Sequence, residues 1–368
     1  MKIAFYIDEL NYRGVANSTY LYALNNIKIL KNKSFIFFNK KNKANKSKVL
    51  RKFKKKFKTF GVKNFKEIDT YQKFYKFDFL YVQKGGEKDS WVSSNIKTTI
   101  HSMYPQKLNE KHGFNYSFIS EWLSEKFSNK KISFVPLIVQ THKIKENLKT
   151  KLKIKNDALI LGCHGGESSF DLNFVKDAIL NIVNKRKDII FLFLNINKFC
   201  NHPRIKFLKG TIDEKFKRKF INTCDFMMYG RSLGESFGLA CAEFAIHDKP
   251  IISYKFNRHR SHEFHINNDN FIEYHSFGSL VEILKNLKKN SFKKNNVNKN
   301  KYKNFSPKKV MFLFKKEFLS KKKEIKFNYL DYLLNHLNYL KMNYLYIRHK
   351  MYNHFYNYFW KKIVKFYY

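Results

Sequence analysis

Two glutamates eight residues apart, Glu235 and Glu243, have the spacing in this chain that most clearly indicates chemistry. Between them lies the small, glycine-bearing segment 236–240, which follows an expected strand over 225–229 and opens an expected helix over 237–246. The first N–H groups of a helix lack intrahelical partners and carry partial positive charge, so this turn suits a phosphate. Carboxylates beside a bound phosphate are useful when they accept hydrogen bonds from hydroxyls. A sugar joined to a nucleoside diphosphate offers hydroxyls at both ends, so the segment predicts a nucleotide-sugar site.

The same residues resemble the donor site of family 4 glycosyltransferases (group 1 glycosyltransferases), which are retaining enzymes of the GT-B fold. The Glu-x7-Glu pattern with Ser-Phe-Gly-Leu-Ala inside it carries the resemblance, which extends through 220–225 and 249–254. The first strand, expected over 2–7, and the following Gly14 are similar to the family's first strand and glycine loop. The resemblance covers residues 1 to about 319.

The resemblance implies a role for each residue of this segment. Glu235 would hydrogen-bond the transferred sugar, and Glu243 would hydrogen-bond the ribose of the nucleotide. The backbone N–H groups of Phe237, Gly238 and Leu239 would hold the distal phosphate. The alternative is that the two glutamates have no ligand, and that they only cap a surface helix and lie on its exposed face.

Three more candidates follow or end expected strands, where ligands of open α/β sheets bind. His101 ends a strand over 97–101, and the family has a histidine here that faces the donor sugar; a satisfied strand-end residue is the alternative. Gly165 lies in a tight turn after a strand over 158–163, and Gly14 could place backbone near the diphosphate or the acceptor. A plain turn explains either glycine equally well.

The chain departs from the family in its basic residues. Most members carry an Arg just after the strand that ends here at Cys163, and a Lys about five residues later, which clamp the diphosphate. This chain has neither, so another cation must neutralise the leaving group. Arg231, four residues before Glu235, is the first candidate, and Arg258 and Arg260 come next.

A metal is not expected. No aspartate is followed two residues later by another, so the metal-binding Asp-x-Asp of the other large glycosyltransferase fold is missing. His259, His262 and His265 could supply imidazoles. Arg258 and Arg260, on either side of His259, would repel a cation, and a phosphate-contacting loop or an exposed polar segment is the preferred interpretation. The predicted site therefore needs no cofactor beyond its nucleotide co-substrate.

Apolar runs of strand length alternate with amphipathic helical stretches, a pattern typical of parallel sheets covered by helices. The sequence predicts an α/β protein of GT-B type: two Rossmann-like domains facing across a cleft, and a basic helical extension. The expected division is 1–136 (acceptor side), 137–304 (donor side), 305–326 (closing helix) and 327–368 (extension). Expected strands cover 2–7, 34–38, 78–82, 97–101, 132–135, 158–163, 188–195, 205–208, 225–229 and 250–254.

The formal net charge of +44 indicates attraction to polyanions, although an AT-rich coding bias explains part of the lysine content. Four scattered cysteines without a C-x-x-C pair indicate reduced thiols, and the apolar start is broken by Asp8 and Glu9, unlike a signal peptide. We therefore expect a cytoplasmic protein. Residues 285–368 could also touch an anionic membrane surface; otherwise their leucine stripe packs on the protein body or on another copy.

Together these features predict a glycosyltransferase of carbohydrate biosynthesis that moves a sugar from a UDP- or GDP-linked donor to a hydroxyl of a glycan, lipid or small molecule. The resemblance implies retention of the anomeric configuration without a metal. Two rivals stay open: a nucleic-acid-binding protein on a similar scaffold, and a degenerate transferase that binds its donor without turnover.

Overall fold

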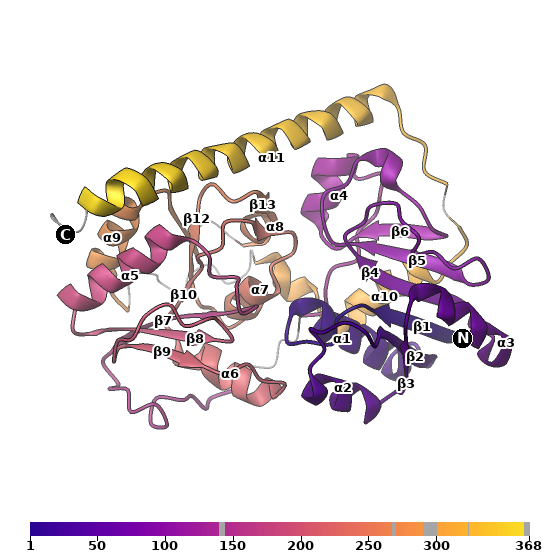
Figure 1. Cartoon of the computed structure of the whole chain (residues 1–368), viewed down its shortest axis with the longest axis horizontal. Helices are drawn as coiled ribbons and strands as arrows, with labels where there is room; N and C mark the ends of the chain where they lie inside the picture. The colour runs from indigo at the N-terminus through magenta and orange to yellow at the C-terminus, as the bar shows by residue number, and fades with distance from the viewer. Residues whose placement is uncertain (140–143, 267–269, 290, 292–299, 323, 364–368) are drawn as a thin grey trace. The chain divides into compact units, whose positions relative to one another are not determined.

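The computed structural model describes residues 1–139, 144–266, 270–289, 291, 300–322 and 324–363. Packing divides the chain into two compact units. Unit 1 comprises Met1–Gln140 and Asn304–Tyr339, and unit 2 comprises Thr141–Lys303 and Leu340–Tyr368. Each unit has its own parallel sheet and its own buried core (Figure 1).

Unit 1 is built on a six-stranded parallel sheet in the order β3-β2-β1-β4-β5-β6. Its strands are β1 (Lys2–Ile7), β2 (Lys33–Asn39), β3 (Lys58–Val62), β4 (Phe79–Lys84), β5 (Lys97–Ser102) and β6 (Asn115–Phe118). Its helices are α1 (Gly14–Lys28), α2 (Ser47–Lys54), α3 (Ile68–Tyr75), α4 (Glu121–Ser128) and α10 (Pro307–Phe318), with short 3₁₀ turns η1 (Phe65–Glu67) and η2 (Leu108–Glu110). The central strand β1 is apolar and buried along almost its whole length, as expected of a parallel strand covered on both faces.

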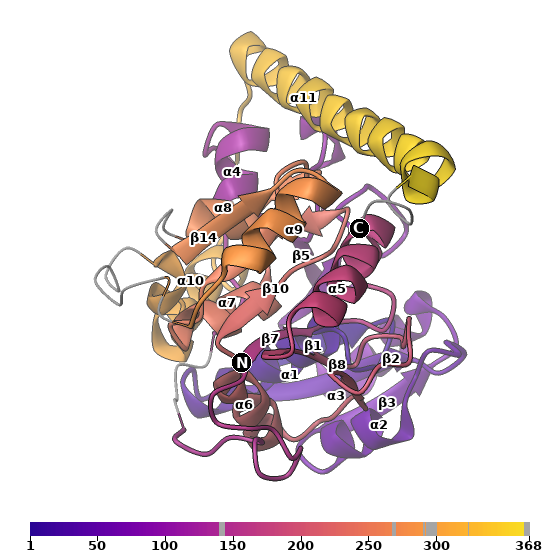
Figure 2. The ribbon, with the colours of Figure 1, turned by 90° about the vertical axis from the view of Figure 1, so that its left-hand side faces the viewer.

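Unit 2 repeats this architecture with a six-stranded parallel sheet in the order β14-β12-β10-β7-β8-β9. Its strands are β7 (Leu159–His164), β8 (Ile189–Leu194), β9 (Ile205–Leu208), β10 (Phe226–Met228), β12 (Ile251–Tyr254) and β14 (Phe271–Tyr274), and a separate parallel pair joins β11 (Gly234–Glu235) to β13 (His259–Arg260). Its helices are α5 (Asn173–Lys185), α6 (Glu214–Thr223), α7 (Leu239–Ile246), α8 (Ser261–His265) and α9 (Phe277–Asn286), with the 3₁₀ turn η5 (Lys301–Asn304). Helices α5 and α9 lie side by side (Figures 1 and 2).

Both sheets have the same doubly wound strand order. Taken in chain order, the six strands of each unit are arranged 3-2-1-4-5-6. In such a sheet the winding reverses between the first and fourth strands, and ligands bind beyond the carboxyl ends of the strands at that point. In unit 2 this switch point lies between β7 and β10.

Two expected elements differ from the structure. The strand expected over 132–135 does not form, and Phe134 makes only an isolated bridge to Phe118. The helix expected over 237–246 begins at Leu239, because Gly238 has a φ of 86° that cannot continue a helix. Glu235 therefore lies in the short strand β11 and not in the first turn of α7.

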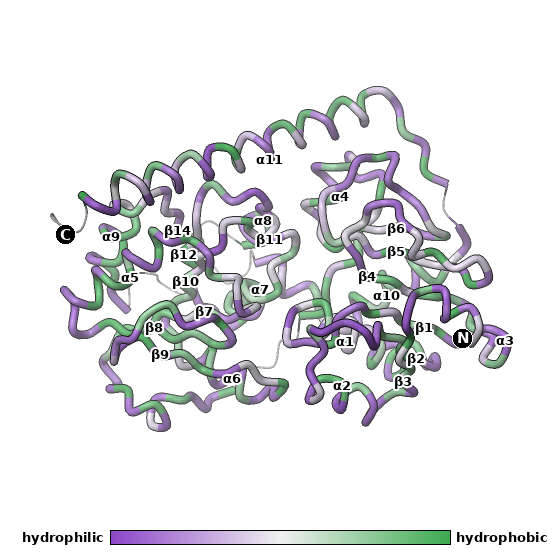
Figure 3. The backbone as a smooth tube through the Cα atoms, viewed as in Figure 1, coloured by the Kyte–Doolittle hydropathy of each residue, from purple (hydrophilic) through white to green (hydrophobic). Residues whose placement is uncertain are grey.

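The C-terminal extension is helical, as expected. Helix α11 (Tyr329–Phe355) continues into a π-helical turn (Tyr356–Trp360). Hydrophobic segments concentrate in the two sheets, whereas hydrophobic and hydrophilic residues alternate along α11 (Figure 3). Within the described ranges, no helix combines the length and hydropathy needed to cross a bilayer. The lysine- and asparagine-rich run 292–299, part of the segment expected to touch a membrane, lies outside the described residues.

Candidate functional site

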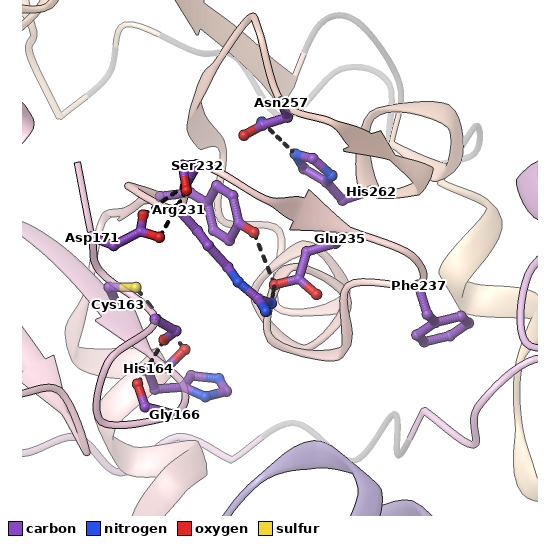
Figure 4. A network of polar contacts seen from close by, with 12 residues as sticks. Cys163, His164, Gly166, Asp171, Arg231, Ser232, Glu235, Phe237, Asn257 and His262 are labelled. Atoms are coloured by element: carbon purple, nitrogen blue, oxygen red, sulfur yellow. Dashed lines mark hydrogen bonds and ion pairs between the residues drawn. The ribbon is translucent and has the colours of Figure 1, made fainter. Parts of the chain in front are cut away.

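The candidate site is built from the loops that leave β7 and β10, the two strands at the switch point of unit 2. His164 is the last residue of β7, and the segment between β10 and α7 carries Arg231 and Glu235 (Figure 4). Asp171 ties the two loops together, because its carboxylate accepts hydrogen bonds from the backbone N–H (2.7 Å) and the hydroxyl (2.8 Å) of Ser232.

Glu235 is held by two side chains from its own loop. One carboxylate oxygen, Oε1, accepts a hydrogen bond from the Tyr229 hydroxyl (2.9 Å) and another from the Arg231 guanidinium (3.1 Å). The side chains of Arg231 and Glu235 are 27% and 19% exposed, so both retain a solvent-facing part. Burial, and then Glu235, raise the pKa of Tyr229 well above its usual value, so this hydroxyl remains a donor. Arg231 and Glu235, which the sequence singled out for separate roles, therefore contact one another.

Two glycines shape the loop between β10 and α7. Gly234 has a φ of 72°, and a Cβ there would lie 2.0 Å from the carbonyl oxygen of His259. Gly238 has a φ of 86°, and a Cβ there would lie 2.9 Å from Cβ of His262. Both positions therefore require glycine for their backbone conformation and for space.

The N-terminus of α7 has no side-chain cap, because its N-cap residue is Gly238. Leu239 is the first helical residue. Phe237 is buried, and its carbonyl accepts a hydrogen bond from the Tyr302 hydroxyl (2.5 Å), which fixes the backbone just before the helix. The first-turn N–H groups of α7 can thus serve an anion at this edge of the sheet.

Glu243 points from α7 toward two cationic or polar neighbours. Its Oε1 accepts a hydrogen bond from Lys217 of α6 (2.6 Å), and its Oε2 lies 3.0 Å from Nε2 of His164. Burial alone would raise the pKa of Glu243, but Lys217, followed by His164, outweighs it and lowers the pKa to about 2. Glu243 is therefore an ionised carboxylate whose remaining lone pairs can accept hydroxyl donors.

Gly165 lies in the loop that follows β7. Its carbonyl accepts a hydrogen bond from the Asn195 side chain (2.6 Å), and a Cβ at this position would lie 2.5 Å from Oγ of Ser169. His164, the last residue of β7, lies beside Glu243. Burial, and then Glu235, raise the pKa of the neighbouring Cys163 thiol to about 12, and all four cysteines are free.

The two other candidate arginines are engaged elsewhere in unit 2. Arg260 contacts Glu263 (2.5 Å) and Glu273 (3.2 Å), and the Arg258 guanidinium lies over the ring of Tyr346. Of the three arginines considered from the sequence, Arg231 is the one paired with Glu235.

His101 lies in unit 1, on β5, with no solvent exposure. Its Nε2 donates a hydrogen bond to the carbonyl of Val135 (2.8 Å), and its Nδ1 lies 2.6 Å from the Tyr81 hydroxyl. Burial lowers the pKa of His101 to about 3, so the ring is neutral. These contacts favour the alternative of a satisfied strand-end residue. Gly14, also in unit 1, is the first residue of α1, and a Cβ there would meet nothing within 4 Å.

The three histidines of 259–265 are buried, which corrects the expectation of an exposed polar segment. Burial lowers the pKa of each to about 3, so all three are neutral. Nε2 of His262 lies 3.1 Å from the Ser253 hydroxyl, and Cβ of His262 would be 2.9 Å from a Cβ at Gly238. Among the described residues, no group of histidine, cysteine, aspartate or glutamate side chains is arranged to hold a metal ion.

Sequence reasoning missed Lys217, His164 and Tyr229. Lys217 reaches Glu243 from another helix, and His164 reaches it from the end of β7. Tyr229 was assigned to a strand without a role. No spacing within a short stretch of sequence reports such contacts, because they form only when separate strands and helices assemble.

Solved glycosyltransferases share this fold. A glycosyltransferase from Rickettsia africae ESF-5 matches with a TM-score of 0.59 at 14% identity, covering 94% of this chain and 98% of that chain. Anabaena HepE, solved with UDP and glucose, has a TM-score of 0.58 at 10% identity, covering 93% and 99%. The lipopolysaccharide outer core galactosyltransferase WaaB has a TM-score of 0.56 at 13% identity, covering 87% and 99%.

No protein-family model and no curated protein matches the chain. At such low identities the structural likeness concerns the fold, and it confirms the GT-B class predicted from the sequence.

Proposed function

We propose that this protein is a cytoplasmic glycosyltransferase that moves a sugar from a UDP- or GDP-linked donor to a hydroxyl of a glycan, lipid or small molecule. One arrangement carries the proposal. The uncapped N-terminus of α7 lies at the switch point of the second sheet, and it is preceded by the Arg231–Glu235 pair and followed by the ionised Glu243. The UDP complex of a protein with the same fold supports a nucleotide-sugar donor.

In this proposal Glu243 binds the nucleotide. A ribose hydroxyl donates a hydrogen bond to its carboxylate, which Lys217 keeps ionised at all physiological pH values. The first-turn amides of α7 bind the distal phosphate, as helix N-termini bind anions elsewhere. Glu235 accepts a hydrogen bond from a hydroxyl of the sugar while Tyr229 and Arg231 fix its orientation.

The reaction exchanges one bond at the anomeric carbon for another. The bond to the phosphate oxygen breaks with oxocarbenium character, the acceptor oxygen forms the new bond, and its proton passes to the departing phosphate. Attack from the same face as the leaving group gives retention. Arg231 and the α7 amides stabilise the charge that develops on the diphosphate, so no metal is required by this scheme.

A second candidate is a protein that binds the donor without turnover. The observation that favours it is that His164, with Gly165 and Gly166 behind it, stands where the resembling family has its Arg and Lys clamp. Both oxygens of Glu243 also already face protein groups. A donor nucleotide would then have to compete with Lys217 and His164 for the Glu243 carboxylate.

Calorimetric titration with UDP, GDP and their sugars, combined with a donor-consumption assay, tests the proposal. We expect one nucleotide series to bind, slow donor hydrolysis, and about tenfold weaker nucleotide binding for Glu243→Gln, because a charged acceptor is lost. Glu282→Gln, an exposed glutamate of the same unit, is the matched control and should bind like wild type. Binding without donor consumption in the presence of candidate acceptors supports the second candidate.

The remaining outcome would exclude both candidates. If no nucleotide or nucleotide sugar binds, while single-stranded nucleic acid binds with an affinity that falls steeply with salt, the net charge of +44 and not the α7 site determines the function.

A further inference from the structure

The outward face of α11 is an apolar stripe exposed to solvent. Leu333, Leu337, Leu340, Tyr344, Ile347 and Met351 are between 40% and 68% exposed. Their spacing alternates between four and three residues, so at 3.6 residues per turn they lie within an arc of about 80°. Figure 3 shows the resulting alternation of hydrophobic and hydrophilic segments along the helix. A row of large apolar side chains on one face marks an interaction site.

The opposite side of the helix packs on the protein. Asp331, Asn335 and His349 are buried on this side. The Asn335 side chain donates to the carbonyls of Gln106 (3.0 Å) and Phe127 (2.8 Å), and within unit 2 the Tyr356 hydroxyl donates to Asp177 (3.0 Å). Two of the asparagines of the extension, Asn335 and Asn338, are therefore used to dock the helix and do not interrupt the stripe. The side chains of the stripe, by contrast, are at least 40% exposed.

The charge around the stripe has one sign. After Asp331 the chain contains no aspartate or glutamate, and it contains six lysines and arginines. Asp331 itself is buried, with Lys131 bound to its carboxylate at 2.5 Å. Lys341 and Lys350 are exposed and lie on opposite sides of the stripe, about 80° and 100° from its centre line. The outward face thus combines an apolar centre with basic flanks.

Two kinds of surface could cover the stripe, a second copy of this chain or an anionic bilayer, and the basic flanks favour the bilayer. A second copy would bring Lys341 and Lys350 against the same lysines, or against another part of a chain whose net charge is +44. An anionic bilayer instead attracts the basic flanks and accepts the apolar side chains at the boundary of headgroups and acyl chains. Tyr344, one of the exposed tyrosines, has the amphipathic ring that suits this depth.

We propose that the outward face of α11 binds the surface of an anionic bilayer, with the helix axis in the plane of the membrane. The helix is about 40 Å long, which allows the whole stripe to contact lipid at once. This inference is independent of the donor chemistry, because it uses no residue of the α7 site.

Sedimentation with lipid vesicles tests the proposal on the full chain. We expect binding to vesicles of phosphatidylcholine with about 30% phosphatidylglycerol to be at least about tenfold tighter than to phosphatidylcholine alone, and to weaken with salt. The triple variant Leu337→Asn/Leu340→Asn/Ile347→Asn should bind the anionic vesicles at least about tenfold more weakly. Because these side chains are about half exposed, the triple variant should stay folded, and its thermal unfolding should shift only by the lower helix propensity of asparagine.

The matched control replaces exposed phenylalanines outside α11. Phe74 on α3 and Phe312 on α10 are 81% and 68% exposed, and Phe74→Asn/Phe312→Asn should bind vesicles like wild type. Equal vesicle binding by wild type and the triple variant would overturn the proposal, because net charge alone would then explain it. Light scattering that shows a wild-type dimer and a monomeric triple variant would overturn it in favour of a second copy.

Discussion

The ammonium of Lys217 lies 2.6 Å from Oε1 of Glu243, although the two residues belong to different helices, α6 and α7. Glu214 contacts the same ammonium at 3.0 Å. The Lys217 and Glu243 side chains are only 16% and 13% exposed, so little water remains to solvate either charge. The charge and orientation of Glu243 are therefore set by the fold before any nucleotide arrives.

Replacing Lys217 should show how far the stability of the protein depends on its ion pair with Glu243. Lys217→Met leaves the Glu243 carboxylate largely buried without its cation, and loss of one partner of a buried pair costs about 3 kcal/mol. We expect the free energy of unfolding, measured by chemical denaturation near pH 7, to fall by about this amount. Lys215→Met, which removes an exposed partner of Glu146, should leave it unchanged. Equal effects of the two substitutions would show that the largely buried Lys217–Glu243 pair contributes no more to stability than the exposed Lys215–Glu146 pair.

Acid should unfold the protein well before its carboxylates titrate. Burial lowers the pKa of four histidines to about 3, whereas the unfolded chain protonates them near 6.5; the four are His101, His259, His262 and His265. Because the unfolded state binds more protons in this range, stability is lost as the pH falls from about 6.5 toward 3. Each histidine contributes a slope of about 1.4 kcal/mol per pH unit, so the four together contribute about 5.5 kcal/mol per pH unit.

Equilibrium unfolding at a series of pH values measures this slope. His262→Asn should reduce the slope by about 1.4 kcal/mol per pH unit below pH 6, whatever its effect on stability at pH 7. The exposed His275→Asn is the control and should leave the slope unchanged. A flat stability profile between pH 6 and 4 would mean that these histidines are accessible to protons in the native state.

The fold could be predicted largely because its central strands are continuous apolar runs. The expected strands over 2–7 and 205–208 coincide with β1 and β9, and the others predicted correctly differ by one or two residues at their ends. The missed strands of the two six-stranded sheets, β3, β6 and β14, lie at sheet edges, whereas the fourth edge strand, β9, was predicted. The two-residue strands β11 and β13 were also missed. An edge strand is covered on fewer sides, so its sequence needs no long apolar run, and β3 (Lys-Thr-Phe-Gly-Val) shows none.

In the candidate site, too, local features could be predicted from the sequence and contacts between separate elements could not. The sequence singled out Arg231 and Glu235 from their spacing in one loop, although it predicted a phosphate-neutralising role for Arg231 and not the ion pair that the two residues form. The contacts of Glu243 with Lys217 and His164 join three elements, so they depend on tertiary packing that no local pattern reports. The start of α7 was misplaced by two residues because a glycine at positive φ was assigned to the helix.

Gly238 should be irreplaceable. Gly238→Ala forces an L-residue into a φ of 86° and brings its Cβ within 3.0 Å of both His262 and Tyr302, so the free energy of unfolding should fall by about 2 kcal/mol. The shifted turn should also weaken nucleotide binding. Gly278→Ala in α9, where a Cβ meets nothing within 4 Å, should be neutral or slightly stabilising. Thermal unfolding with and without UDP or GDP measures both effects, and a Gly238→Ala variant as stable as wild type would contradict the strained turn.

Arg231 should act mainly on the rate of sugar transfer. Its guanidinium holds Glu235 in the resting protein and would meet the charge that develops on the leaving diphosphate. Because that charge grows toward the transition state, Arg231→Ala should lower kcat about 100-fold and change KM for the donor by less than about threefold. Steady-state kinetics with the donor identified by calorimetry measures the two constants separately.

Arg260→Ala, which breaks the contacts with Glu263 and Glu273, is the control and should retain wild-type kcat. If Arg231→Ala raised KM and left kcat unchanged, Arg231 would bind the donor equally in the ground and transition states, and the leaving group would have to be stabilised by the α7 amides alone.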